Sequence, residues 1–405
     1  MVAWSRSRLA ATILLFTTPA ILAILAFSVF PILLSSYISF TNRNAFHPNP
    51  DCNVALTGIL DPVCWPQFRA NAPKGLGEPY TLVDPIYKNY ADLFAGLFSA
   101  EALWALGRIV ISLLPLIGAY YLNKRWDKGL ERPVSAGVVW GAGLLGVVLV
   151  ALVVNLGGAY NDLTNTGDFI VVVLRTILFV LIRVPLTFVI GLVLALILNQ
   201  PELPGKTFFR VVLFVPWAAS SLAILMAKVW EFFFREQGTL NQLLRVFDIQ
   251  GIAWLQNPIS AFGAIVLADV WFSYPFFMIA ILGGLQSITA DQYEAAEVDG
   301  ATWWDKLTAI TLPNLRPVIL PAIVLTSITA FQMFGTAYAM TQGGPSAGAG
   351  KPGATEFVIV YAFRQIFQTQ NYGRATAFAV IIFIFLFLVT VWSLRYTRIT
   401  KGAYE

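Results

Sequence analysis

The chain has 405 residues, of which 58% are hydrophobic and only 12% are charged, and its formal net charge is +4. Soluble globular proteins usually carry about twice that charged fraction, which argues against a large soluble protein. No basic stripe with interleaved aromatic residues is present, so nucleic-acid binding has no support. Repeated apolar runs predict an all-α, polytopic membrane protein embedded in a lipid bilayer.

The first segment is a short basic start followed by a long apolar run over residues 11–39. A cleavable signal peptide has an apolar region of only about 7–15 residues. Because this run is far longer, residues 1–40 are predicted to form a retained N-terminal transmembrane helix.

A polar segment rich in Pro, Asn and Asp follows over residues 41–103 and is predicted to be an extracytoplasmic loop. It contains both cysteines, Cys52 and Cys64, and the only histidine, His47. Neither cysteine belongs to a CxxC pair, so no metal site is expected. A Cys52–Cys64 disulfide and two free thiols are both compatible with the sequence.

Seven further apolar runs are long enough to cross a bilayer, which brings the total to about eight. They cover residues 104–122, 134–155, 170–198, 209–233, 261–286, 316–340 and 373–394. The positive-inside rule favours cytoplasmic termini, because the short inner segments then hold about half of all Lys and Arg. These inner segments are the two termini, 122–133, 199–208 and 289–315.

The sequence ELPGKT at residues 202–207 ends like a phosphate-binding P-loop. The glycine that begins a P-loop is replaced by Gln200, and no strand precedes the segment. The chain is therefore expected to bind neither ATP nor Mg²⁺ itself.

One polar stretch, EAAEVDGATWWDKLTAITLP at Glu294–Pro313, separates two very apolar runs. It favours a helix up to Asp299, a turn at Gly300, where a Cβ would hinder the backbone, and a second helix that Pro313 ends. The apolar residues of the second helix recur at helical spacing: Trp303, Leu307 and Ile310. An amphipathic helix lying in the membrane interface is the simplest alternative.

This pattern resembles the EAA loop of ABC-importer permeases. In that family the loop is a coupling helix that docks into a groove of a separate ATPase subunit. The resemblance implies a polar contact for Glu294, the turn for Gly300, and a docking face around Asp299 to Trp304. The matching positions are Glu294, Ala295, Ala296, Asp299, Gly300, Ala301, Leu312 and Pro313.

The resemblance extends from about residue 170 to the C-terminus, through FFRVVLFVPWAASSLAILMAKVWEFFF, TQGGP and NYGRATAFAVIIF. These segments are similar to the carbohydrate-importer branch, and within it to the larger permease of maltose/maltodextrin-type importers. This implies a type I ABC importer permease fold, with a core domain over 170–397, a coupling loop over 290–313 and an extra transmembrane helix pair over 104–155. The large periplasmic domain of the enterobacterial permease is replaced by NLGGAYNDLTNTGDF.

Candidate substrate contacts lie in the sixth and seventh apolar runs. Asp269 is a carboxylate within an apolar run, and such residues usually face a cavity or a partner. The resemblance places eight residues at sugar-lining positions: Asp269, Phe272, Ser273, Phe276, Thr326, Thr329, Ala330 and Met333. Gln332 and Tyr338 are additional candidates. Hydrogen bonding between helices is the alternative role for the polar members of this set.

Two arginines lie within the fourth apolar run. Arg175 is expected to extend its guanidinium to the membrane interface. Arg183 is expected to pair with a carboxylate or a helix end, and no transport role follows from its position.

The sequence therefore predicts a non-enzymatic, multi-pass subunit of an ATP-driven importer in a prokaryotic plasma membrane. The expected cargo is a maltose-, maltodextrin- or trehalose-like oligosaccharide. The resemblance implies three partners: a second permease subunit, a dimer of ATPase subunits that bind ATP and Mg²⁺, and an extracytoplasmic sugar-binding protein. A stand-alone secondary transporter or channel is the alternative, and it would call for inverted repeats.

Overall fold

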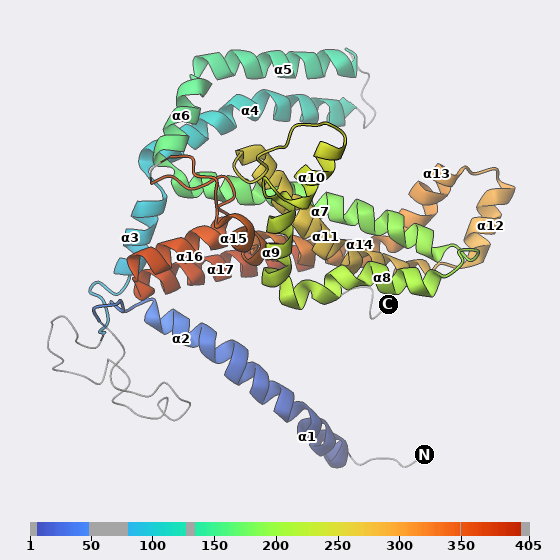
Figure 1. The fold of residues 1–405 in the computed structure, drawn as a ribbon, viewed down its shortest axis with the longest axis horizontal. Helices are drawn as coiled ribbons and strands as arrows, with labels where there is room; N and C mark the ends of the chain where they lie inside the picture. Colours follow the sequence, from blue (N-terminus) through green and yellow to red (C-terminus); the bar gives the residue numbers. More distant parts are fainter. Residues whose placement is uncertain (1–5, 48–79, 127–133, 349, 398–405) are drawn as a thin grey trace. The chain divides into compact units, whose positions relative to one another are not determined.

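A computed structural model describes residues 6–47, 80–126, 134–348 and 350–397 (Figure 1). Within these ranges the fold is all-α, and the only strand-like pairing is an isolated bridge between Thr41 and Leu82. Eight helical stretches there are long and apolar enough to cross a membrane, which confirms the predicted fold class. The predicted Cys52–Cys64 pair lies outside the described residues.

The chain divides into two compact units. The first contains α1 (Arg6–Ile24), a π-helical turn (Leu25–Val29), α2 (Phe30–Ile38), most of α3 (Lys88–Leu97), most of α16 (Val358–Thr369) and most of α17 (Tyr372–Thr397). The side chain of Asn89 donates to the carbonyls of Ser39 and Thr41, both at 2.8 Å. The helix α3 therefore fixes the end of α2 and lies within the predicted loop 41–103.

The second unit begins with α4 (Ala100–Trp126), α5 (Ala136–Val153) and α6 (Leu156–Thr166). The helices α4 and α5 pack closely because α5 has a glycine, Gly143, where it meets Ala119 of α4. A Cβ added at Gly143 would lie only 2.8 Å from the Cβ of Ala119. The short connection NLGGAYNDLTNTGDF is largely helical, since Asn155 caps α6 through its side-chain oxygen, which accepts from the N–H of Gly158.

The centre of this unit is formed by α7 (Asp168–Asn199), α11 (Pro258–Leu285) and α14 (Leu312–Phe331). The helix α11 is the most buried of the candidate spans. It approaches α7 where Gly191 leaves room, because a Cβ at that position would lie 2.5 Å from the Cβ of Phe277. This close approach fixes the register of α7 against α11.

The remaining helices of the second unit are shorter. They are α8 (Lys206–Ala218), α9 (Ala223–Phe234), α10 (Thr239–Val246), α12 (Ala290–Val298), α13 (Trp303–Asp305), α15 (Gly335–Thr341) and the start of α16 (Val358–Thr369). Two predicted spans are therefore discontinuous. A 3₁₀ turn at Ala219–Leu222 separates α8 from α9, and a non-helical stretch after Gln332 separates α14 from α15.

The prediction that Pro313 ends a helix is wrong. The chain passes from α13 through a π-helical turn (Lys306–Thr311) directly into α14, in which Pro313 occupies the first turn. Thr311 and Leu312, directly before Pro313, have helical backbone angles, and the proline is accommodated next to a π-helical turn, where the i to i+4 ladder is already interrupted.

Candidate functional site

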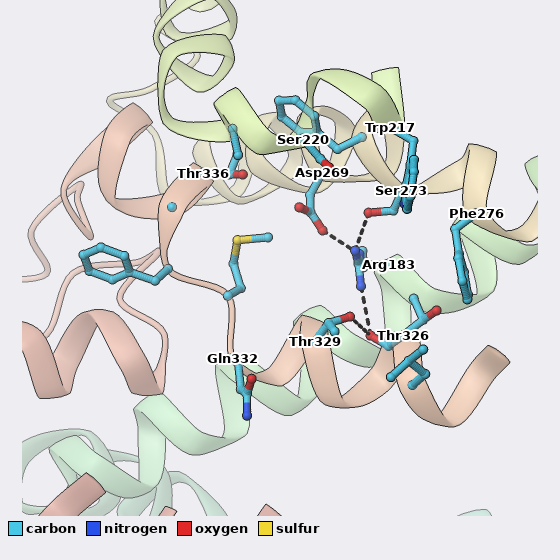
Figure 2. A pocket seen from close by; sticks show the side chains of 16 residues that line it. Arg183, Trp217, Ser220, Asp269, Ser273, Phe276, Thr326, Thr329, Gln332 and Thr336 are labelled. Carbon is cyan, nitrogen blue, oxygen red and sulfur yellow. Dashed lines mark hydrogen bonds and ion pairs between the residues drawn. The ribbon is translucent and has the colours of Figure 1, made fainter. Parts of the chain in front are cut away.

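A cavity of about 490 Å³ opens among the helices of the second unit (Figure 2). It is bordered by α7, α11, α14 and both breaks in the discontinuous spans. The side chains that line it are Arg183, Trp217, Ser220, Ala223, Asp269, Phe272, Ser273, Phe276, Leu325, Thr326, Thr329, Gln332, Met333, Phe334, Gly335 and Thr336.

Both helix breaks meet this cavity. Ser220 lies in the 3₁₀ turn after α8, and Met333 and Phe334 lie in the non-helical stretch after α14. Backbone that leaves the helical path at membrane depth is tolerated where it is buried in protein or lines a water-accessible cavity. The two helix breaks therefore lie where the protein interior accommodates non-helical backbone.

Seven of the eight residues predicted as sugar contacts line this cavity. Four of them lie on α11 at Asp269, Phe272, Ser273 and Phe276, and this spacing places them on one helix face. Thr326, Thr329 and Met333 come from α14 and the residues after it.

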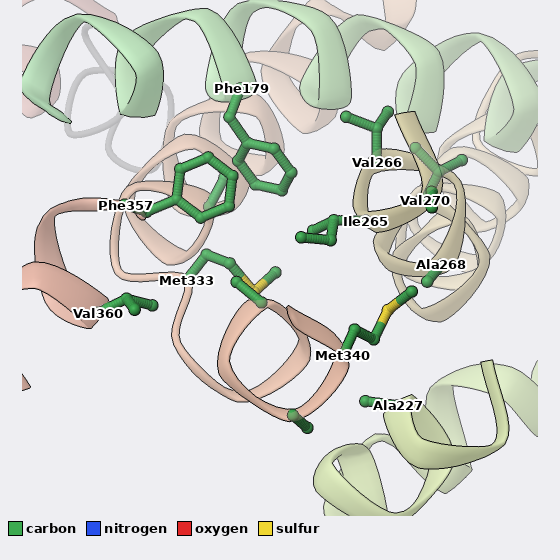
Figure 3. Packing of buried hydrophobic residues seen from close by; sticks show 14 of the residues in the cluster. Phe179, Ala227, Ile265, Val266, Ala268, Val270, Met333, Met340, Phe357 and Val360 are labelled. Atoms are coloured by element: carbon green, nitrogen blue, oxygen red, sulfur yellow. The ribbon is translucent and has the colours of Figure 1, made fainter. Parts of the chain in front are cut away.

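The eighth predicted contact, Ala330, is fully buried in the adjoining apolar core and does not border the cavity. Figure 3 shows this core, in which Phe179 and Phe357 pack with ring centroids 4.6 Å apart and Met333 lies beside Ile265. Of the additional candidates, Gln332 lines the cavity, whereas the ring of Tyr338 stacks on that of Phe334 at 5.1 Å.

Arg183 is one of the cavity residues that the sequence did not assign to transport. Its Nε lies 2.5 Å from Oδ2 of Asp269, so its predicted carboxylate partner is on α11. Its Nη1 donates to the carbonyl of Thr326 at 3.0 Å, and its Nη2 donates to the hydroxyl of Ser273. One side chain therefore joins α7 to α11 and α14 at the cavity wall (Figure 2).

The cavity can bind a ligand without covalent chemistry. Hydroxyl and amide groups from Ser220, Ser273, Thr329 and Gln332 offer hydrogen bonds, and aromatic rings stand among them. No group of three or more His, Cys, Asp or Glu side chains suited to a metal occurs in the described part of the chain. Walls that combine apolar and aromatic side chains with a few polar groups are typical of small-molecule sites.

Arg175 reaches the glycine-rich segment that the sequence predicts to be an outer loop. Its Nη1 donates to the carbonyls of Pro352 and Gly353, at 3.2 and 2.6 Å, in the glycine-rich segment after α15. The same segment is held to the start of α7 by Lys351, whose Nζ lies 3.2 Å from Oδ1 of Asp168. The guanidinium therefore anchors this loop to α7.

The predicted coupling segment forms a helical hairpin of α12 and α13. Gly300 adopts φ +77° between them, where a residue with a Cβ would be strained. The N–H of Ala301 donates to the carbonyl of Ala296 at 2.9 Å, which closes the end of α12. The hairpin is thus a defined turn between two helices.

Two further contacts brace this hairpin. Thr302 and Asp305 form a reciprocal capping box at the start of α13. The Nζ of Lys306 lies 2.7 Å from Oε1 of Glu297, and this hydrogen bond and charge lower the pKa of the Glu297 carboxyl.

The hairpin presents large apolar side chains to its surroundings. Val298 is 89% exposed, and Trp303 and Trp304 are 62% exposed each. Of the predicted coupling residues, Glu294, Ala295, Asp299 and Gly300 are exposed on the hairpin, and Ala296 and Ala301 are half-buried there. Leu312 and Pro313 are half-buried within α14 instead.

Comparison with known sequences decides the family. The family described as "Binding-protein-dependent transport system inner membrane component" matches residues 187–401, just over half of the chain, including the cavity helices α11 and α14 and the hairpin. The chain belongs to this family. As an inner-membrane transport component, it is a multi-pass subunit of a binding-protein-dependent system and not a stand-alone transporter.

Several relatives of this transport component are described as permease proteins of transport systems. The trehalose/maltose transport system permease protein MalF of Thermococcus litoralis is 36% identical over 227 residues, covering 56% of the chain and 74% of the relative. The sulfoquinovosyl glycerol transport system permease protein SmoG of Agrobacterium fabrum is 36% identical over 224 residues, covering 55% and 70%.

A third relative is the maltose/maltodextrin transport system permease protein MalF of Salmonella typhimurium, which is 30% identical over 281 residues, covering 67% of the chain and 54% of the relative. The chain thus spans about half the length of this Salmonella relative. Among solved structures, a bacterial alginate ABC transporter in complex with alginate pentasaccharide-bound periplasmic protein has a chain with 22% identity and a TM-score of 0.47, covering 58% and 80%.

Proposed function

We propose that this transport component is one of two membrane subunits of an ATP-driven saccharide importer in a prokaryotic plasma membrane. The observation that carries the proposal is the cavity, because it combines hydroxyl and amide groups with the rings of Trp217, Phe272 and Phe276. Saccharides present hydroxyls around their edges and apolar C–H faces suited to aromatic rings. Its volume of about 490 Å³ lies within the range usual for small-molecule sites.

The substrate class is proposed to be a maltose-, maltodextrin- or trehalose-like oligosaccharide. The names of the Thermococcus and Salmonella relatives support this class. Seven residues that the family resemblance associates with sugar contact line this one cavity, which supports the same class.

ATP hydrolysis is proposed to take place in a dimer of separate ATPase subunits that bind ATP and Mg²⁺. The support is the exposed apolar surface of the hairpin at Val298, Trp303 and Trp304, which is suited to a groove on a partner protein. The distribution of Lys and Arg favours a cytoplasmic position for this hairpin and for both termini.

Transport is proposed to proceed by alternating access. An extracytoplasmic sugar-binding protein supplies the saccharide, and a second permease subunit completes the pathway. ATP binding shifts the population of the complex towards the outward-open state because the nucleotide binds the ATPase dimer better in that state. The hairpin transmits this shift through α14, which begins next to it and ends at the cavity.

Reconstitution tests the proposal. The tagged chain would be purified with its co-expressed partners and placed in proteoliposomes, with ATP sealed on the side of the ATPase subunits and maltose or trehalose outside. We expect uptake of at least one saccharide that requires ATP and the binding protein. Saccharide uptake that persists without ATP, or purification with no ATPase subunit, would contradict the proposal.

A further inference from the structure

The wall of the cavity contains one positive and one negative charge. Arg183 and Asp269 are each 5% exposed, and the other fourteen side chains that line the cavity are uncharged. The two charges face each other, with Nε and Oδ2 only 2.5 Å apart. The two charges of the cavity wall therefore balance each other.

The guanidinium of Arg183 contacts other groups of the protein. A guanidinium stays protonated in proteins, so its charge has to be balanced by its neighbours. Here it forms an ion pair with the carboxylate of Asp269 and donates hydrogen bonds to the hydroxyl of Ser273 and the carbonyl of Thr326. An anionic ligand entering the cavity would compete with Asp269 for the guanidinium and be repelled by that carboxylate.

Packing of α7 against α11 does not by itself call for such a pair. Buried ion pairs can often be replaced by apolar residues of similar volume without loss of stability, because desolvation offsets their attraction. The close approach at Gly191 and the apolar core beside the cavity already join these helices. The position of the pair at the cavity wall therefore points to a role in ligand selection.

We propose that Asp269 acts as a charge filter: by pairing with Arg183 it keeps this buried cation from binding acidic saccharides, and so makes the cavity selective for uncharged ones. This inference rests on the proposed saccharide pathway and adds a specificity-determining role for Asp269. The paired side chains cancel each other's charge, and removal of the carboxylate alone would leave a cation available to a uronate. The filter thus depends on the balance of the two groups and not on either group alone.

The test is binding to the complete transporter in nanodiscs, measured by saturation-transfer difference NMR, which detects weak ligands. The probes are maltotriose, which is neutral, and trigalacturonate, which carries carboxylates. In Asp269→Asn we expect the ratio of trigalacturonate to maltotriose affinity to rise by about tenfold or more, the effect of one charge-assisted hydrogen bond. An unchanged ratio in an assembled Asp269→Asn complex would overturn the inference.

Two further variants complete the test. Asp269→Ser removes the same charge and leaves room for water beside the guanidinium, so it should raise the ratio as well. The double variant Arg183→Gln/Asp269→Asn removes both charges and should return the ratio to the wild-type value. A double variant that also gains affinity for trigalacturonate would contradict the filter, since the gain would then not depend on the free cation.

Assembly is informative too. If Asp269→Asn and Asp269→Ser both failed to assemble while the double variant assembled, charge balance would be a requirement of folding. The ligand filter would then be rejected. Failure of the proposed function is separately recognisable, because the wild-type complex would then bind neither saccharide. Binding of maltotriose by the wild type with no shift in the variants would reject only the charge filter.

Discussion

The Nε of Arg183 on α7 lies 2.5 Å from Oδ2 of Asp269 on α11, and this ion pair forms part of the cavity wall. The arginine also reaches the carbonyl of Thr326, so three helices meet at one side chain. Loss of one charge is therefore expected to destabilise the packing of these helices, whereas loss of both charges together is expected to be tolerated.

The first prediction concerns this pair. Arg183→Met leaves the carboxylate of Asp269 buried without its partner, and we expect the complex to lose about 3–5 kcal/mol of stability. Arg183→Met/Asp269→Leu should recover most of that loss. Thermal unfolding of the purified complex measures both variants.

The control for this prediction is an ion pair in the same unit whose cation is exposed. Lys228 lies 2.7 Å from Glu231, and its side chain is 51% exposed. Lys228→Met should change stability by at most about 1 kcal/mol. Equal losses for Lys228→Met and Arg183→Met would show that burial of the Arg183 pair has no energetic consequence.

The second prediction compares two glycines in the middle of helices. A Cβ at Gly191 would meet the Cβ of Phe277 at 2.5 Å, whereas a Cβ at Gly263 would meet nothing within 4 Å. Gly191→Ala should therefore destabilise the complex by about 1–3 kcal/mol through overpacking. Gly263→Ala should be neutral or stabilise it by up to about 1 kcal/mol, because alanine favours the helix. Melting temperatures that move in the same direction for both variants would contradict the packing at Gly191.

The third prediction concerns the turn of the hairpin. Gly300 has φ +77°, which proline cannot adopt, and there is open space around its Cα. Gly300→Pro should abolish transport and substrate-stimulated ATP hydrolysis without weakening the cavity helices. Gly300→Asn should keep most of the activity, since asparagine tolerates this backbone conformation better than most residues. Normal coupling in Gly300→Pro would remove the basis for a coupling hairpin.

The fourth prediction concerns the exposed apolar surface of the hairpin. Trp303→Ser/Trp304→Ser should release the ATPase subunits during purification, because large exposed aromatic residues are the usual anchors of protein interfaces. The chain itself should stay folded, since neither side chain is buried. Val246→Ser alters a residue that is 76% exposed elsewhere and serves as the control. Undiminished recovery of the ATPase subunits with the double variant would place their docking site elsewhere.

Much of the fold could be predicted because hydropathy reports directly on membrane spans. The α11 contacts at Asp269, Phe272, Ser273 and Phe276 could also be placed on one face, since their spacing follows the helical period. Their grouping with residues of α14 came from the family resemblance, because separation along the chain gives no information on packing.

Other features were beyond the sequence for physical reasons. The breaks at Ala219–Leu222 and after Gln332 lie within continuous apolar stretches, so hydropathy gave no sign of them. Pro313 was predicted to end a helix, but the chain passes through it as a helix from the π-helical turn into α14. The pairing of Arg183 with Asp269 depends on the register of two helices, which Gly191 fixes through its contact with Phe277.

The most direct test of the saccharide pathway is protection of the cavity from chemical modification. Cys52 and Cys64 would be replaced by serine, and Thr329→Cys introduced at the cavity wall, with Ser346→Cys in the exposed loop after α15 as the control. The complex, supplied with its binding protein, ATP and maltotriose, would then be labelled with a maleimide. Maltotriose is expected to slow labelling at position 329 and leave position 346 unaffected. Equal labelling rates at position 329 with and without the saccharide, in a complex that transports it, would contradict a pathway through this cavity.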